Sequence, residues 1–198
     1  MNPLIKTIVP KIHLANRPKF VQWLGRTLHK ASGWKVEGEV PNLKKFILVG
    51  APHTSNWDFV HALILIWAID LKLNVLAKHT LFKIPILKNI LSGIGGIPVD
   101  RKNPRLVVDE VSKLTKGDGG VIIGLTPEGT RKKVEKWKSG FLRIAEQTDS
   151  KIVLIGIDFK KKICSFSGFF EPTGDNEQDI KFIKSFYKNF KPKIPNNF

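Results

Sequence analysis

The sequence predicts a single α/β domain with a largely parallel, mixed sheet flanked by helices. Apolar runs of strand length alternate with stretches of helical periodicity along most of the chain, which is typical of strands joined by helices. The length of 198 residues fits one ordinary domain with a substantial core. No internal repeat, low-complexity tract or linker interrupts this pattern.

Six runs have the length and composition of strands. The run KFILVGA, residues 45–51, is apolar after its first lysine and predicts a strand buried in the sheet. The predicted strands are residues 45–51, 74–78, 96–99, 120–125, 151–157 and 163–169.

Helices are predicted between these strands. The clearest begins at Asn103, an N-cap candidate followed by Pro104 at the first helical position, and ends at Gly117 after apolar residues at helical spacing. The other predicted helices are residues 19–31, 57–70, 80–91, 139–148 and 177–190.

The chain is strongly basic, with 33 Lys and Arg residues against 17 Asp and Glu and a formal net charge of +16. Such a charge favours a polyanionic partner, which can be a nucleic acid, an anionic membrane surface or an acidic carrier. The first acidic residue is Glu37. The basic residues before it are Lys6, Lys11, Arg17, Lys19, Arg26, Lys30 and Lys35.

Basic residues near both ends of the chain alternate with large apolar ones. Each block can be a basic amphipathic helix on a lipid surface, or a surface helix whose aromatic residues face the core. We predict that residues 1–35 are a basic, amphipathic, membrane-contacting segment and that residues 36–198 form the main domain. The apolar residues concerned are Phe20, Trp23, Leu24 and Leu28 in the first block, and Phe182, Phe186 and Phe190 among the lysines of the second.

The sequence also predicts where the protein resides. Its single cysteine, Cys164, excludes an internal disulfide and suits a reducing compartment. Residues 1–20 lack the apolar core and cleavage site of a signal peptide. The longest apolar run, residues 62–69, is far shorter than the about 20 residues of a membrane-spanning helix. We therefore expect a cytoplasmic protein that associates peripherally with the inner face of the membrane.

The stretch PHTSNWDF, residues 52–59, forms the predicted turn from the first central strand into a helix. Ligands gather at the carboxyl ends of strands in such sheets. Ser55 and Asp58 match a capping box, which explains both residues without any chemistry but leaves His53 unexplained. With His53 in the turn and Asp58 in the first helical turn, the two side chains can meet.

A histidine held by an aspartate is a potential general base. The carboxylate fixes the tautomer of the imidazole and leaves its other nitrogen to accept a proton. Such a pair can deprotonate a substrate hydroxyl, which then attacks a thioester without a covalent enzyme intermediate.

Two further stretches place arginines at strand ends. In GLTPEGTRKK, residues 124–133, Gly129 allows a sharp turn or a close backbone approach, and Arg131 presents a guanidinium suited to phosphate. In GGIPVDR, residues 95–101, Arg101 follows another predicted strand. We expect these arginines at the same sheet edge as His53.

These stretches resemble the sequence blocks of the glycerolipid acyltransferase family, whose members acylate glycerol 3-phosphate, lysophosphatidate and related lysolipids. His53 and Asp58 match its histidine, four residues, aspartate block, and residues 127–131 match its Pro-Glu-Gly-Thr-Arg block letter for letter. The Asp-Arg block is matched by residues 95–101. Weaker matches lie at residues 77–85 and 138–145, and the resemblance spans residues 46–157.

The resemblance implies a glycerol-3-phosphate acyltransferase-like fold and an O-acyltransferase activity. Residues 36–198 would then be the acyltransferase domain. A fatty acyl group would pass from an acyl thioester, either acyl-CoA or acyl-acyl carrier protein, to a hydroxyl of a glycerolipid or lysophospholipid acceptor. No metal or other cofactor is implied.

The resemblance also implies a role for each residue. His53 would be the general base and Asp58 its orienting partner. Glu128 has the wrong charge for phosphate, so we expect it to orient an arginine or to accept a hydrogen bond from a glycerol hydroxyl. The implied substrate-binding residues are Lys78, Arg101, Glu128, Gly129, Thr130 and Arg131.

The chain departs from the family pattern in two places. Gly156 stands where the fourth block usually has proline, and Pro52 replaces the asparagine that commonly precedes the histidine. The departure at Pro52 indicates a divergent branch whose acceptor need not be lysophosphatidate. His61 and His79 are expected to be structural or surface residues.

Two other functions remain open. A nucleic-acid-binding protein is favoured by charge alone, and because no recognised binding motif accompanies the charge we expect no nucleic-acid partner. A non-catalytic relative that binds lipid headgroups is the other alternative, against which the His53 and Asp58 pair argues.

Overall fold

The central strand β2, Lys45–Ala51, shows how the sheet is built. The computed structural model describes residues 8–100 and 103–198. Successive β2 side chains point to opposite faces, because a strand has a period of two. Phe46 and Leu48 belong to one apolar cluster, whereas Ile47 and Val49 belong to another on the opposite face. The sheet is therefore covered on both sides, as the continuous apolar run predicted.

Within the described residues, seven strands form one sheet in the order β1-β7-β6-β2-β5-β3-β4. The strands from β6 to β4 are mutually parallel, β7 is antiparallel to β6, and β1 is parallel to β7. This confirms the predicted mixed, largely parallel sheet. The other strands are β1 (Lys35–Glu37), β3 (Asn74–Lys78), β4 (Ile97–Val99), β5 (Val121–Leu125), β6 (Lys151–Asp158) and β7 (Ile163–Phe170).

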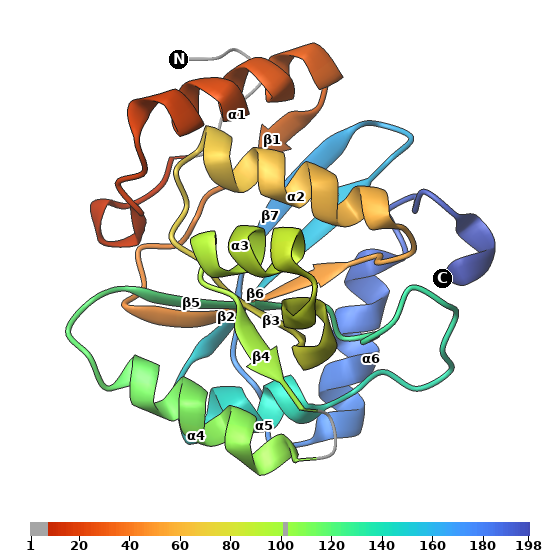
Figure 1. Ribbon diagram of the computed structural model, residues 1–198. Coiled ribbons are helices and arrows are strands. Elements are labelled where there is room, and N and C mark those ends of the chain that lie inside the picture. Colours follow the sequence, from red (N-terminus) through yellow and green to blue (C-terminus); the bar gives the residue numbers. More distant parts are fainter. Residues whose placement is uncertain (1–7, 101–102) are drawn as a thin grey trace.

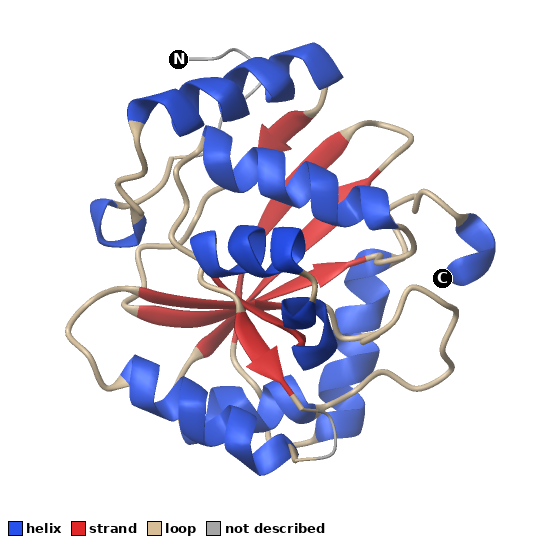
Figure 2. Cartoon of the chain, in the orientation of Figure 1, coloured by secondary structure: helices blue, strands red, loops and turns tan. Residues whose placement is uncertain are grey.

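Helices cover both faces of the sheet (Figures 1 and 2). Helices α2 and α3 bury residues in the first cluster, and α4, α5 and α6 bury residues in the second. Helix α1 packs on α2 so closely that a Cβ atom at Gly25 would lie 2.5 Å from the Ala68 N and 2.7 Å from the Trp67 carbonyl carbon. The helices are α1 (Lys19–Ser32), α2 (Asn56–Ala68), α3 (Pro85–Gly93), α4 (Pro104–Thr115), α5 (Gly140–Gln147) and α6 (Asn176–Tyr187). The described part of the chain also contains three short 3-10 turns, η1 (Lys11–His13), η2 (His79–Lys83) and η3 (Pro195–Asn197).

Most predicted elements are confirmed to within a few residues, but the helix over residues 80–91 was wrong in part. A 3-10 turn, η2, ends at Lys83, Ile84 is extended with φ −92° and ψ 115°, and α3 begins only at Pro85. Proline has no N–H to continue a preceding helix and forces the residue before it toward extended geometry. Strand β1 was missed because its three residues, KVE, contain one apolar residue and so form no apolar run. Helix α6 ends at Tyr187, not at residue 190.

The two terminal blocks differ in how their aromatic residues pack. In the C-terminal block, Phe186 and Phe190 pack against the second cluster, which agrees with a surface helix facing the core, whereas Phe182 is 52% exposed and stacks on Phe170. In α1, by contrast, Phe20 and Trp23 are 67% and 57% exposed and their rings stack with centroids 5.8 Å apart. In the described part of the chain, no helix has both the length and the apolar character needed to cross a bilayer.

Residues 13–17, shortly before α1, are fixed to the main domain by buried polar contacts. Asp70 accepts hydrogen bonds from the backbone N–H groups of Asn16 and Arg17 at 3.0 and 3.1 Å. The buried His13 bonds through Nε2 to the Leu43 carbonyl at 2.7 Å. These contacts hold α1 on the domain with its exposed aromatic pair turned outward.

Candidate active site

The turn after β2 carries the predicted histidine at the edge of the sheet. Strand β2 ends at Ala51, and α2 begins at Asn56 with Ser55 as its N-cap. The Ser55 and Asp58 side chains form a complete capping box, as the sequence predicted. The turn therefore lies at the carboxyl end of a central parallel strand, where α/β proteins bind their ligands.

One oxygen of Asp58 serves both the helix cap and the histidine. Asp58 Oδ2 accepts hydrogen bonds from the backbone N–H groups of Thr54 and Ser55 at 2.7 and 2.9 Å. The same oxygen lies 3.0 Å from Nδ1 of His53. The Asp58 side chain is 3% exposed, and that of His53 is 21% exposed. Asp58 can therefore cap helix α2 and orient His53 at the same time.

This geometry assigns the hydrogen on the His53 ring. An ionised carboxylate can only accept hydrogen bonds, so the Nδ1 facing Asp58 carries the hydrogen. Nε2 is then left with a lone pair on a ring that is partly accessible to solvent. The arrangement can take a proton from a group that approaches Nε2.

Glu128, from the loop after β5, holds the turn from the other side. Its two carboxylate oxygens accept a hydrogen bond from the backbone N–H of His53 at 2.9 and 3.1 Å. The carboxyl group is buried, and burial raises the pKa of Glu128 to about 8, although the His53 N–H acts in the opposite direction. The observed partner of Glu128 is thus the histidine backbone, whereas an arginine or a glycerol hydroxyl was expected.

The predicted phosphate-binding arginine lies beside the start of α2. Arg131 Nη1 donates a hydrogen bond to Oδ1 of Asn56. The loop reaches this position through Gly129, whose φ of +64° is unfavourable for any residue with a side chain. Thr130 Oγ1 accepts a hydrogen bond from the Lys132 N–H and helps to shape the same loop. The first and third sequence blocks are therefore adjacent.

The remaining predicted binding residues are less closely tied to the turn. Lys78 ends β3, is exposed, and is separated from β2 by β5 in the sheet. Arg101 lies outside the described residues. Of the other histidines, His61 stacks on Trp34 with ring centroids 4.2 Å apart, and burial lowers its pKa. His79 is exposed, so both agree with the expected structural or surface role.

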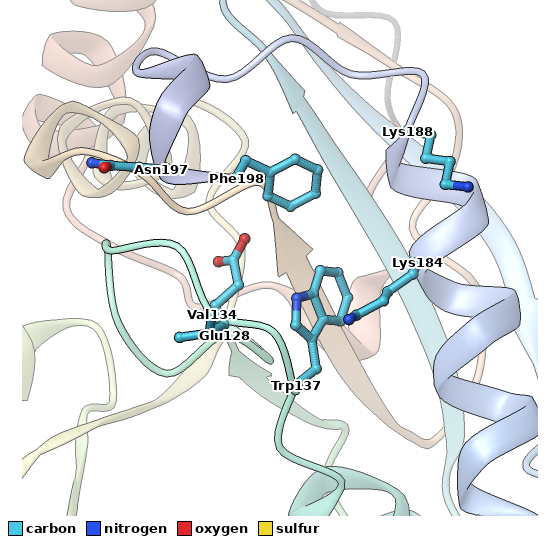
Figure 3. A pocket seen from close by; sticks show the side chains of 7 residues that line it. All are labelled: Glu128, Val134, Trp137, Lys184, Lys188, Asn197 and Phe198. Carbon is cyan, nitrogen blue, oxygen red and sulfur yellow. The ribbon is translucent and has the colours of Figure 1, made fainter.

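A pocket adjoins Glu128 on the side of α6 (Figure 3). The Glu128 carboxylate points toward the Phe198 side of this pocket. The Trp137 and Phe198 rings lie 6.2 Å apart, and Lys184 Nζ is 5.5 Å from the Trp137 ring centre. The lining residues are Glu128, Val134, Trp137, Lys184, Lys188, Asn197 and Phe198.

The C-terminal residues 190–198 cover the turn that carries His53. The Ile194 N–H donates to Thr54 Oγ1 at 3.2 Å, and Asn197 Nδ2 donates to the Thr54 carbonyl at 3.4 Å. As a result Thr54 is buried. Sequence reasoning missed Thr54, Asn56 and Asn197, because contacts across 75 to 143 positions leave no local pattern.

Gly156 lets this C-terminal segment pack on the sheet. A Cβ atom at Gly156 would lie 2.1 Å from the Phe190 ring, far closer than van der Waals contact. The Lys191 carbonyl also accepts a hydrogen bond from the Phe159 N–H at 2.8 Å. Gly156, where the family pattern has proline, thus leaves room for the Phe190 ring. Residues 191–198 continue from Phe190 toward Thr54.

With this fold and this site, the chain belongs to the acyltransferase family, whose sequence model matches residues 34–158. A 1-acyl-sn-glycerol-3-phosphate acyltransferase of Borreliella burgdorferi is 30% identical over 118 residues, which are 58% of this chain and 46% of that protein. The chain thus matches about half of that relative's length. The crystal structure of the 1-acyl-sn-glycerophosphate (LPA) acyltransferase PlsC from Thermotoga maritima is similar with a TM-score of 0.62 and 21% identity, over 86% of this chain and 76% of that one. These similarities confirm the predicted family and fold.

The contact between Gly156 and Phe190 predicts a strong coupling between the two positions. We expect Gly156→Ala to destabilise the protein by about 1–3 kcal/mol, the range typical of overpacking. In a Phe190→Ala background this cost should fall close to zero. Urea unfolding of the four proteins measures the coupling. Gly50→Ala is a matched control, since its Cβ would meet Ile155 at an ordinary 3.5 Å. An equal cost of Gly156→Ala in both backgrounds would contradict the packing.

The buried Glu128 predicts a specific pH dependence of stability. Its folded pKa of about 8 exceeds the ordinary value of 4.5, so the folded state binds the proton more tightly than the unfolded state. Stability relative to Glu128→Gln should therefore decrease by a few kcal/mol as the pH rises from 5 to 8. The glutamine retains an oxygen that can accept the His53 N–H. Chemical unfolding of both proteins at each pH measures the difference, and parallel stability curves would show that Glu128 is not perturbed.

Proposed function

We propose that the protein is an O-acyltransferase that moves a fatty acyl group from an acyl thioester to a hydroxyl of a glycerolipid or lysophospholipid acceptor. The observation that carries the proposal is the 3.0 Å contact between His53 Nδ1 and the buried Asp58 carboxylate, in a sequence block of the acyltransferase family. The names of the two relatives support a glycerolipid acceptor.

His53 is the general base in this proposal. Its Nε2 takes the proton of the acceptor hydroxyl while the hydroxyl oxygen attacks the thioester carbonyl carbon. Asp58 stabilises the resulting imidazolium. The carbon–sulfur bond then breaks, and the leaving thiolate receives the proton from His53. The products are an ester and a free thiol, and His53 returns to its neutral form.

The other predicted residues position the acceptor. Arg131, beside Asn56 at the start of α2, is suited to bind a phosphate or another anionic headgroup. Lys78 and Arg101 are proposed to add positive charge at the same edge. Gly129 and Thr130 shape the Arg131 loop, and Glu128 fixes the His53 backbone. The proposed donors are acyl-CoA or an acyl carrier protein, whose acidity suits the basic surface.

We also propose that the protein acts on the cytoplasmic face of an anionic membrane, with residues 1–35 as a contact. Support comes from α1, where the exposed Phe20 and Trp23 lie among Lys19, Arg26 and Lys30. Aromatic side chains that insert into the interface, flanked by basic residues, are typical of peripheral membrane helices.

Replacement of the base tests the mechanism directly. His53→Ala should reduce thiol release from a long-chain acyl donor by about 10²- to 10⁴-fold, the usual contribution of a general base. Asp58→Asn should also slow the reaction, because an amide does not stabilise the imidazolium. The rates are measured with a panel of lysolipids below their micellar concentrations. His79→Gln, at an exposed position, is the matched control and should retain the wild-type rate.

A near-full rate in His53→Ala would refute the proposed chemistry. Salt-sensitive retardation of RNA or DNA, without acylation of any lipid, would favour the nucleic-acid alternative.

The membrane contact is tested by removing the exposed aromatic pair. Phe20→Ser with Trp23→Ser should lower recovery with floated anionic vesicles by about tenfold or more, because two large apolar side chains no longer insert. Leu106→Ser with Leu114→Ser, at exposed positions of α4 on the other face of the sheet, should leave recovery unchanged. Equal loss in both variants, or in neither, would contradict a specific role of α1.

A further inference from the structure

A second exposed apolar surface lies away from α1. We call it the η2–α3 segment, residues 79–93. Its Leu81, Ile84 and Ile86 side chains are 38%, 48% and 74% exposed. Among the large apolar side chains that the structure describes, Ile86 is the most exposed. Such a cluster on a small protein marks a contact with a partner or a membrane.

Helix α3 is apolar but buries little of its surface. Its sequence PILKNILSG contains four large aliphatic residues, of which Leu91 alone is fully buried. An ordinary surface helix turns its apolar residues to the core and its polar ones to water. Here Ile86 is turned to solvent at the start of the helix, so packing within the domain does not explain the composition of this segment.

The charge around the segment favours an anionic occupant. The 29 residues between Asp70 and Asp100 contain no Asp or Glu and four lysines. Two of these, Lys83 and Lys88, lie within the segment and are exposed. Residues 1–36, which include α1, share this absence of acidic residues. Exposed aliphatic side chains flanked by lysines match the interface of an anionic bilayer.

The segment lies in the same helical layer as α1 and α2, and the His53 turn leads into α2. Helices α1, α2 and α3 lie on one face of the sheet (Figure 1). Leu91 of α3 and Leu65 of α2 belong to the same buried cluster. The N-terminal part of α2, next to His53, exposes Trp57 and Val60. Exposed apolar side chains thus occur on all three elements of this layer.

We propose that the η2–α3 segment is a lipid-contacting element that inserts Leu81, Ile84 and Ile86 into an anionic membrane surface. Together with α1 it forms a two-point attachment. With a single contact the protein can tilt freely about it. Contacts through both α1 and the η2–α3 segment restrict this tilt, so that the helical layer faces the lipid. The start of α2, and with it His53, is then held near the acceptor. This inference rests on the proposed function, since it explains how a membrane-bound lysolipid reaches the base.

A site-specific fluorescent reporter tests the contact. The native Cys164 is buried, and burial raises its pKa to about 12, so it does not compete for a thiol-reactive dye. The full chain is labelled with an environment-sensitive NBD dye at Ile86→Cys. The control is Leu106→Cys, a residue on α4 that is 59% exposed. Vesicles of phosphatidylglycerol and phosphatidylcholine should shift the emission at position 86 to the blue and increase it, and should leave position 106 unchanged.

Several outcomes would overturn the proposal. One is an unchanged signal at position 86 on protein that floats with the vesicles. Another is no flotation at all. A signal that rises with protein concentration in the absence of vesicles would show that a second copy of the chain covers the segment instead.

A kinetic measurement separates this inference from the proposed function. The variant combines Ile84→Asn, which suits an N-cap, with Ile86→Gln, which suits a helix, so that the fold is retained. With a lysolipid below its micellar concentration the variant should match the wild type. With the acceptor embedded in anionic vesicles its rate should fall by about tenfold or more. Equal rates of both proteins on vesicles would refute the lipid contact, whereas an inactive wild type would refute the proposed function.

Discussion

The site depends on one buried carboxylate oxygen, Asp58 Oδ2. It accepts the backbone N–H groups of Thr54 and Ser55 and faces Nδ1 of His53. The start of α2 and the orientation of the imidazole therefore rely on the same negative charge. The dipole of α2 favours that charge at its N-terminus. Loss of the carboxylate would leave two donors without their acceptor and free the ring at once.

The parallel sheet supplies the second constraint. Strands β2 and β5 are neighbours, with Val49 in register with Leu125, so the loops that follow them leave the sheet together. Glu128 can therefore bond to the backbone of His53, and Arg131 to Asn56. The proposed general base and the arginine proposed to bind an anionic headgroup thus come from two loops that are distant in sequence. The parallel pairing of β2 and β5 is sufficient to bring the two loops together.

The local chemistry and the meeting of the His53 and Arg131 blocks at one sheet edge were predictable from the sequence, whereas the individual long-range contacts were not. The capping box and the approach of His53 to Asp58 follow from residue types within one turn. The partner of Glu128 was missed because a backbone N–H has no sequence signature. The chemistry of proline favours a helix start at Pro85, as observed, but the prediction joined residues 80–91 into one helix. The packing of Phe190 on Gly156 joins residues that are far apart in the sequence, so no local periodicity predicts it.

The proposed mechanism requires that Asp58 holds His53 with its hydrogen on Nδ1, so that Nε2 is free to act as the base. The most direct measurement is a long-range ¹H–¹⁵N correlation spectrum of the histidine side chains, assigned with His53→Gln and recorded at a pH where the ring is neutral. The contact between Asp58 and Nδ1 predicts the Nδ1–H tautomer for His53 and a change of this signal in Asp58→Asn. A neutral Nε2–H tautomer in the wild type would show that Nε2 is not available as the base.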